Sequence, residues 1–263
     1  MKLASTIVAS ALLIATSIAT TPVTASDIPL SERRSGYTFM APDTQAIQDD
    51  DTTNPGMLGV LDGQALWNNK AGAANKACAD CHGDARTSMK GVAARYPAFD
   101  KTLGRPVNLE QRINLCRVGQ QQASPLAYER RDLLALTAFI AEQSRGMAIA
   151  PDDSPELKPF VAKGHDFFMK RQGQLNLGCT NCHDDNWDKH LAGSAVTQAM
   201  ATGYPIYRLE WQSLGSLQRR LRNCITGMRA QNYDFGSPEL VELELYLMSR
   251  AKGMPIETPG VRP

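Results

Sequence analysis

The sequence predicts an all-α protein that consists of two tandem copies of one small domain, preceded by an extended N-terminal arm. The segment around Cys78 recurs around Cys179 with many further matches, which indicates an internal repeat. Both copies have apolar residues at helical spacing on either side of a cysteine motif. Neither copy has the sustained alternation of β-branched and polar residues that is typical of strands.

Length and charge narrow the class of protein. The chain has 263 residues, enough for two domains of roughly 100 residues each. Its 43% hydrophobic and 21% charged residues are ordinary for a folded domain and unlike a disordered chain. The formal net charge is +1, so no overall field draws the protein to nucleic acid or to a membrane surface. We therefore expect no nucleic-acid partner.

Residues 1–26 are typical of an export signal. Lys2 supplies the positive start, an apolar run follows from Ile7 to Ala19, and the small residues Val23 and Ala25 frame a cleavage site. The apolar run is shorter than the roughly 20 residues that span a bilayer, and no second run follows it. We predict a signal peptide cleaved near residue 25 or 26, a periplasmic protein and no membrane span.

The next segment, residues 27–56, is polar and contains three prolines and a run of three aspartates. This composition predicts an extended arm over the surface.

The two copies match over most of their length. Proline and acidic residues at 150–155 favour an exposed linker, so we expect the first domain at 57–150 and the second at 151–263. The spacing from the motif histidine to the matched tyrosine is 14 residues in the first copy and 21 in the second, which predicts a loop insertion. The matched pairs are Gly63 and Gly164, Trp67 and Phe168, Tyr96 and Tyr204, Pro97 and Pro205, Cys116 and Cys224, Leu133 and Leu240, and Met147 and Met254.

Each copy contains one Cys-x-x-Cys-His motif, which is typical of covalent haem c attachment. The thiols form thioethers and the histidine is the proximal iron ligand. Two motifs in an exported repeat predict two covalently bound haem c groups in two cytochrome c-like domains. A zinc site of three cysteines and one histidine, with the third cysteine of each copy, is the alternative. The motif residues are Cys78, Cys81 and His82 in the first copy and Cys179, Cys182 and His183 in the second.

The third cysteines, Cys116 and Cys224, have three interpretations. They could form an interdomain disulfide, which an oxidising compartment permits. They could instead be the sixth iron ligands, with Met147 and Met254 as rivals for that role. Equivalent positions in a repeat should have equivalent surroundings, and the methionines follow the last helix of each copy, so we favour cysteine as the axial ligand on both irons.

The second copy is rich in arginine beside its third cysteine. Arg220 lies four residues before Cys224, so on a helix both share one face and the positive charge lowers the pKa of the thiol. Arg112 has the same relation to Cys116, without the other arginines. The many arginines in this short segment of the second copy predict an oxyanion-binding site, and the alternative is that they form a solvated helix face. We expect the second copy to be reactive and the first to relay electrons. The arginines are Arg208, Arg219, Arg220, Arg222 and Arg229.

The segment from Tyr204 to Cys224 resembles the active-site segment of the dihaem SoxA subunits of the Sox thiosulfate-oxidising system, and the resemblance covers nearly the whole mature chain. It implies that Cys224 is both the distal haem ligand and the catalytic cysteine, found as a persulfide, and that Arg220 lies near the substrate. It also implies that Cys116 ligates the first haem.

The same resemblance implies an L-cysteine S-thiosulfotransferase. This activity joins thiosulfate to a cysteine of the SoxYZ carrier protein and passes two electrons to haem, with the small monohaem cytochrome SoxX as permanent partner. Two other functions stay open. One is a pure electron-transfer dihaem cytochrome with methionine as distal ligand, and the other is a non-catalytic docking subunit with a Cys116–Cys224 disulfide.

Overall fold

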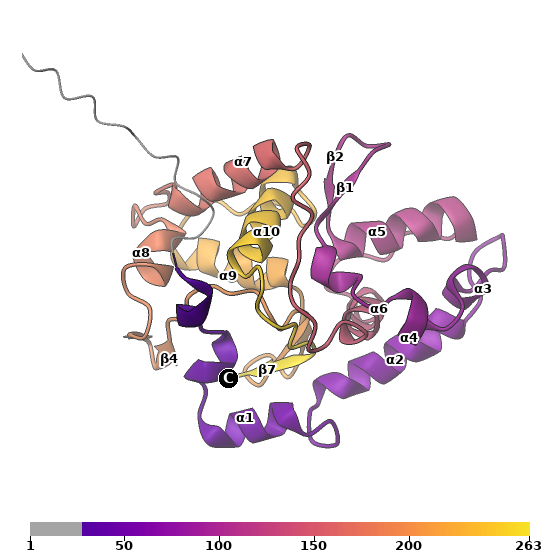
Figure 1. Cartoon of the computed structure of the whole chain (residues 1–263), viewed down its shortest axis with the longest axis horizontal. Helices are drawn as coiled ribbons and strands as arrows, with labels where there is room; N and C mark the ends of the chain where they lie inside the picture. Colours follow the sequence, from indigo (N-terminus) through magenta and orange to yellow (C-terminus); the bar gives the residue numbers. More distant parts are fainter. Residues whose placement is uncertain (1–27) are drawn as a thin grey trace, which may run out of the picture.

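The structure is a computed structural model that describes residues 28–263, so the predicted signal peptide lies outside the described residues. The chain forms two groups of helices that lie side by side (Figure 1). Those of the first copy are α2 (Gly56–Asn68), α3 (Cys78–His82), α4 (Ala85–Ser88), α5 (Leu109–Cys116) and α6 (Arg131–Glu142). Those of the second copy are α7 (Lys158–Met169), α8 (Cys179–His183), α9 (Leu217–Gly227) and α10 (Pro238–Arg250).

Each copy is built on a pair of helices in close contact, α2 with α6 and α7 with α10. Gly63 and Gly164 lie at the closest approach. A Cβ atom on Gly63 would come within 2.1 Å of the carbonyl oxygen of Ala135, and one on Gly164 within 2.1 Å of that of Glu242. The repeated glycines are therefore explained by backbone contact, which only a residue without a side chain permits.

We expect Gly164→Ala to lower the free energy of unfolding by about 1–3 kcal/mol, because α10 must move to admit the methyl group. Thermal unfolding of the haem-loaded protein, followed by circular dichroism, measures the change. Gly227→Ala in α9 is the matched control, since a Cβ there meets no atom within 4 Å. Equal melting temperatures for the two variants would contradict the packing argument.

The predicted helical leucines form two separate cores. Leu133, Leu136 and Ile140 of α6 are buried with Val60, Trp67 and other residues of the first copy. Leu240, Leu243 and Leu247 of α10 are buried with residues of the second copy that include Phe168 and Ile225. The helix-rich prediction is confirmed, and each motif helix packs on its own core.

Short strands are present that the sequence analysis did not predict. β1 (Ala98–Asp100) pairs with β2 (Arg105–Val107), and β5 (Ile206–Arg208) pairs with β6 (Ser213–Gly215), each hairpin leading into the helix that carries the third cysteine. β7 (Gly260–Arg262) joins β5 in parallel. Strands of three residues are too short to show an alternating pattern. The predicted loop insertion contains a further small hairpin of β3 (His190–Leu191) and β4 (Ser194–Ala195).

We predicted an extended N-terminal arm, and this prediction was wrong in part, because the arm contains helical segments. It contains two 3-10 turns, η1 (Leu30–Glu32) and η2 (Gly36–Phe39), and the helix α1 (Pro42–Asp49), whose first residue is a proline with a φ angle suited to that position. Only the segments between these elements are extended.

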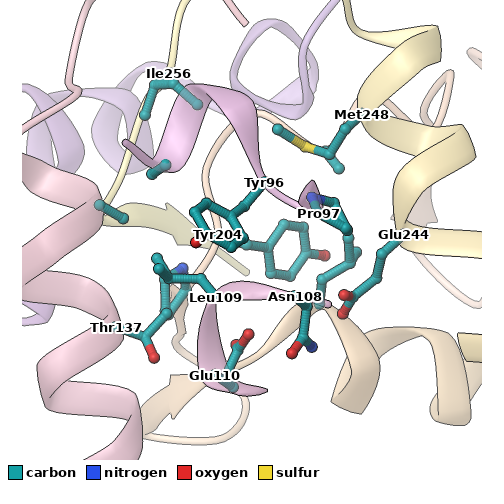
Figure 2. Close-up of a pocket in the computed structure, with 15 residues that line it drawn as sticks. Tyr96, Pro97, Asn108, Leu109, Glu110, Thr137, Tyr204, Glu244, Met248 and Ile256 are labelled. Carbon is teal, nitrogen blue, oxygen red and sulfur yellow. The ribbon is translucent and has the colours of Figure 1, made fainter. Parts of the chain in front are cut away.

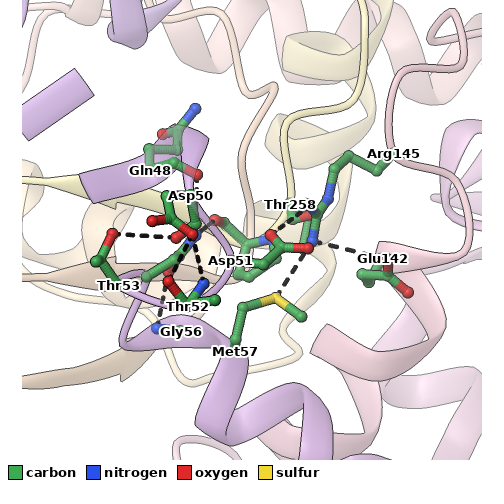
Figure 3. A network of polar contacts seen from close by, with 12 residues as sticks. Gln48, Asp50, Asp51, Thr52, Thr53, Gly56, Met57, Glu142, Arg145 and Thr258 are labelled. Carbon is green, nitrogen blue, oxygen red and sulfur yellow. Dashed lines mark hydrogen bonds and ion pairs between the residues drawn. The ribbon is translucent and has the colours of Figure 1, made fainter. Parts of the chain in front are cut away.

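The arm connects the two copies. Arg33 donates to the carbonyl of Lys252, and Gln48 accepts from the backbone of Val261, both in the second copy. The acidic run also binds the first copy, since Asp51 pairs with Arg145 at 2.7 Å, and Arg145 donates to the carbonyl of Thr258 in the second copy (Figure 3).

The segments that follow α6 and α10 pair with each other. Ile149 donates its backbone N–H to Met254 at 2.8 Å, and Ile256 donates to Met147 at 2.9 Å. Met147 and Met254 thus lie in a backbone ladder between the copies. The limits 57–150 and 151–263 stay our prediction for the domains. No helix among residues 28–263 is long and apolar enough to cross a bilayer.

Candidate active site

Both cysteine motifs form one short helix each. α3 and α8 begin at the first cysteine and end at the histidine. The third motif position closes a local cap, since Asp80 accepts from the backbone of Ala77 and Asn181 from that of Gly178, both at 2.9 Å. Two thiols and an imidazole are thereby presented from a single helical turn in each copy.

The helices with the third cysteines are positioned alike. Asn108 caps α5 by accepting from the backbone of Gln111, and Ser216 caps α9 by accepting from that of Arg219. Cys116 is the last residue of α5, whereas Cys224 lies within α9. A π-helical turn, η4 (Arg117–Gln121), follows Cys116 directly.

In the second copy, the structure brings the motif histidine and the third cysteine together. The thiol of Cys224 forms a hydrogen bond with the ring of His183, and its charge also interacts with Cys179 and Cys182. His183 Nδ1 lies 2.6 Å from the carbonyl oxygen of Thr197. A carbonyl accepts only, so Nδ1 carries the proton and Nε2 is the nitrogen available to a metal.

Two arginines face this cysteine. Burial alone would raise the pKa of the Cys224 thiol, but the hydrogen bond with His183 and the charges of Arg220 and Arg208 outweigh it, and the pKa lies below its usual value. Burial and the charge of Arg220 also lower the pKa of Arg208. Two guanidinium groups that repel each other beside a thiolate form a place where a doubly charged anion is stabilised.

Arg208 is held firmly. It is buried at the end of β5, donates through Nε to the carbonyl of Pro263 at 2.9 Å, and pairs with Glu210 at 3.0 Å. Its guanidinium carbon also lies 5.1 Å from the centre of the Trp211 ring.

The first copy differs at one decisive position. Asp100 ends β1 where Arg208 ends β5, and its carboxylate binds Arg112 at 2.6 Å. Arg112 is thus neutralised by an acid, whereas its counterpart Arg220 has a second arginine as neighbour. Burial raises the pKa of Cys116, and Arg112 opposes this only in part. The third cysteine therefore has two arginines beside it in the second copy, whereas in the first copy the equivalent arginine is paired with an acid.

Fewer arginines lie beside Cys224 than the sequence predicted. Arg219 lies over the Trp211 ring at 4.1 Å and donates to Ser213, and Arg222 lies over Phe235 at 4.5 Å. Arg229 is exposed beyond the end of α9. Of the five arginines, Arg208 and Arg220 are those that act on the charge of Cys224.

The first motif shows fewer contacts. The His82 ring packs against Trp67 with 5.7 Å between the ring centres, and Trp67 donates to the carbonyl of Gly83. The charge of Cys116 interacts with those of Cys78 and Cys81. The third cysteine of this copy thus lies near both motif thiols.

The structure gives little support to the alternative roles that the sequence left open for the cysteines and the matched methionines. None of the six cysteines forms a disulfide, so Cys116 and Cys224 are not joined to each other. Met254 is buried in the second core, and Met147 lies against Gly91. Among residues 28–263, no group of three or more His, Cys, Asp or Glu side chains is arranged to hold a metal ion.

The second copy fits a covalently bound haem c. Cys179 and Cys182 supply the two thiols, His183 has its Nδ1 occupied and Nε2 available, and the thiolate of Cys224 is the group that faces it. In the first copy, Cys78, Cys81, His82 and Cys116 supply the same donor set.

Sequence reasoning missed three features of the site. The specific role of Arg208 could have been found by laying Tyr204 over Tyr96, which sets Arg208 on Asp100. Tyr204 is a near neighbour, since burial raises its pKa while Arg220 lowers it and Cys224 raises it further. The carbonyl of Thr197 carries no sequence signal, because any residue could provide it.

The comparisons with known proteins agree with this geometry. A family model described as SoxA/TsdA, cytochrome c domain, matches residues 62–149 and again residues 163–256. The L-cysteine S-thiosulfotransferase subunit SoxA of Pseudaminobacter salicylatoxidans is 40% identical over 235 residues, covering 89% of this chain and 82% of that protein. The subunit of the same name from Rhodovulum sulfidophilum is 38% identical, covering 88% and 80%.

The likeness extends to a solved structure. The crystal structure of SoxXA from P. pantotrophus matches with a TM-score of 0.85 and 30% identity, over 88% of this chain and 87% of that chain. The chain therefore belongs to the SoxA family, and its two copies are cytochrome c domains.

Proposed function

We propose that this chain is the SoxA-type subunit of an L-cysteine S-thiosulfotransferase. It joins thiosulfate to a cysteine thiol of a SoxYZ-type carrier protein, and the electrons released pass to haem. One thiosulfate and one thiol yield an S-thiosulfonate on the carrier, one proton and two electrons. Relatives that carry this enzyme name are 40%, 38% and 32% identical to the chain.

One observation carries the proposal. The thiol of Cys224 faces His183 of the second motif and has Arg220 and Arg208 beside it. A nucleophilic sulfur and a site for a dianion are thus combined at one place. The first domain, with its Asp100–Arg112 pair, lacks the second cation.

The residues have the following roles in the proposal. Arg220 and Arg208 hold the thiosulfate dianion, and the Cys224 thiolate forms a bond to its sulfane sulfur with the loss of two electrons; the one proton released overall comes from the carrier thiol. The carrier thiolate then attacks that sulfur and takes the S-thiosulfonate, which leaves Cys224 as thiolate. Haem supplies the electron acceptor. The persulfide that the family resemblance implies on Cys224 would be a separate form of this residue, which these steps neither form nor consume.

Two haem c groups complete the proposal. The thioether cysteines are Cys78 and Cys81 for one haem and Cys179 and Cys182 for the other. His82 with Cys116 would hold the iron of the first group, and His183 with Cys224 that of the second. We assign the second haem to the reaction and the first to electron relay.

The family supports a proposed partner, and the first 26 residues support a proposed location. We propose a SoxX-like monohaem cytochrome as permanent partner, and the solved relative is a SoxXA structure. We also propose that the chain is exported to the periplasm by its first 26 residues.

The test combines chemistry with spectroscopy. Purified haem-loaded protein with its SoxX-like partner is mixed with thiosulfate and reduced carrier, and the carrier is weighed by mass spectrometry. We expect one S–SO₃⁻ adduct per carrier cysteine, together with a low-spin paramagnetic resonance signal of histidine–thiolate haem. Electron transfer without any adduct, with a histidine–methionine signal, would instead show a plain electron-transfer cytochrome.

A further inference from the structure

A cavity lies between the two copies, away from the cysteines (Figure 2). Its volume is about 70 Å³, several times the roughly 10–15 Å³ that one water needs on this measure. Equivalent residues of both copies form its wall, which places it on the approximate twofold axis of the repeat. They are Ala93 and Ala201, Tyr96 and Tyr204, Pro97 and Pro205, and Leu109 and Leu217.

Two carboxyl groups enter this cavity from opposite copies. Glu110 comes from the first turn of α5 and Glu244 from the middle of α10. Their exposed fractions are 8% and 5%. Neither forms an ion pair with a side chain in the part of the chain that the structure describes, whose ion pairs all involve other carboxylates. A buried carboxylate without a cation is costly, so a neutral acid is the favoured form.

Unsatisfied donors lie beside the acids. Asn108 and Gln218 are 2% and 0% exposed, and both face the Glu244 carboxyl. The side-chain nitrogens of both amides still have no hydrogen-bond partner of ordinary geometry among residues 28–263. Figure 2 shows Asn108 and Glu244 as neighbours in the wall of the cavity. Buried amide N–H groups of this kind are completed by ordered water in native proteins.

The charges around the acids favour protonation. Burial, together with the charge of Glu129, raises the pKa of Glu110 to about 7. Burial and the charge of Glu110 raise the pKa of Glu244, and the neighbouring amides of Asn108 and Gln218 oppose this only in part. Tyr128 lies near both acids, and Arg105 acts on Tyr128. Arg219 is directed to Glu129 and Ser213, away from the pair.

Neither acid is repeated at the equivalent position of the other copy. Glu110 occupies the position of Gln218 in the other copy, and Glu244 the position of Thr137. Each copy therefore contributes one acid, and each acid has a neutral polar residue as its counterpart. An interface needed only for packing would not contain an acid from both sides.

We propose that this cavity is a hydrated proton-binding site, in which Glu110, Glu244 and ordered water between Asn108 and Gln218 hold at least one proton at neutral pH. The site makes the contact between the two domains dependent on pH. It does not rest on the sulfur chemistry proposed above, because none of these residues belongs to the reacting group.

The expected pH dependence has a definite sign. The folded protein holds protons that the unfolded chain releases above a pKa of about 4.3. Stability is therefore highest at low pH and falls as pH rises towards the folded-state pKa, then levels off. Melting temperatures of the haem-loaded protein between pH 5 and 9 measure this. We expect a fall for the wild type, and a melting temperature about 5 °C higher at pH 9 for Glu110→Gln and Glu244→Gln.

The matched control is Glu156→Gln, an exposed glutamate of the linker, which should keep the wild-type profile. Infrared spectra measure protonation directly, because the two glutamates give a carboxylic-acid band only if they hold a proton. The carboxylic-acid C=O band of the wild type at pH 7 should shift in heavy water and be absent from the double glutamine variant. A wild type without this band at pH 7, or Gln variants with an unchanged pH profile, would overturn the proposal.

Discussion

Replacement of Cys224 by alanine is expected to lower the rate of thiosulfate conjugation by at least about 10³-fold, because the reacting sulfur is removed. The same variant removes the thiolate that faces His183. Mass spectrometry of the carrier protein after a timed reaction measures the rate. The resonance spectrum should lose its thiolate-ligated signal from the second haem at the same time.

Cys116→Ala is the control for the loss of a cysteine near a haem. It changes the equivalent residue of the first copy, where Arg112 is bound by Asp100 rather than directed at an anion. We expect conjugation to persist at a reduced rate, because only electron relay is disturbed. Equal losses in both variants would refute the assignment of the reaction to the second domain.

Replacement of Arg220 by alanine has the second largest expected effect. A charge-assisted hydrogen bond to an anion contributes about 1.5–3 kcal/mol, so kcat/KM for thiosulfate should fall by about 10–150-fold. Arg208→Gln should cause a loss of similar size, because Arg208 is the other cation beside Cys224. Initial rates over a range of thiosulfate concentrations provide both constants.

Arg222→Ala provides the matched control on the same helix. Its guanidinium lies over the Phe235 ring at 4.5 Å and does not act on Cys224, so the kinetics should stay at the wild-type level. Arg220→Lys should recover part of the lost affinity, because lysine restores the charge without the planar fork. A thiosulfate KM and kcat unaffected by Arg220→Ala would remove this residue from substrate binding.

The repeat made most of the fold predictable. A Cys-x-x-Cys-His motif fixes a helical turn, and glycines and leucines at matched positions identify the helix pairs around it. The structure gives the reason for such matches, since Gly63 and Gly164 each contact the backbone of a partner helix. Chemical constraints that act within a few residues, or twice in one chain, are therefore readable from the sequence.

Features that depend on contacts between distant segments were not readable. The hairpins after Tyr96 and Tyr204 are held by three-residue strands, and the arm helix α1 depends on its contact with β7. The difference between Asp100 and Arg208 was visible in the aligned copies, but its meaning required knowing that each of these residues lies beside the arginine that precedes the third cysteine. Glu110 and Glu244 are 134 positions apart, and no local pattern predicts that they share a cavity.

The backbone ladder between residues 146–149 and 253–256 should hold the two copies together after proteolytic cleavage of the segment that connects them. Asp152 and Asp153 of the connecting segment are exposed, so a protease can cut there. The two fragments would stay joined through that ladder and through the arm, whose Gln48 and Asn54 bind the far end of the chain. The cut protein would stay one particle in solution, and the two cytochrome c domains would keep their relative placement without the covalent connection.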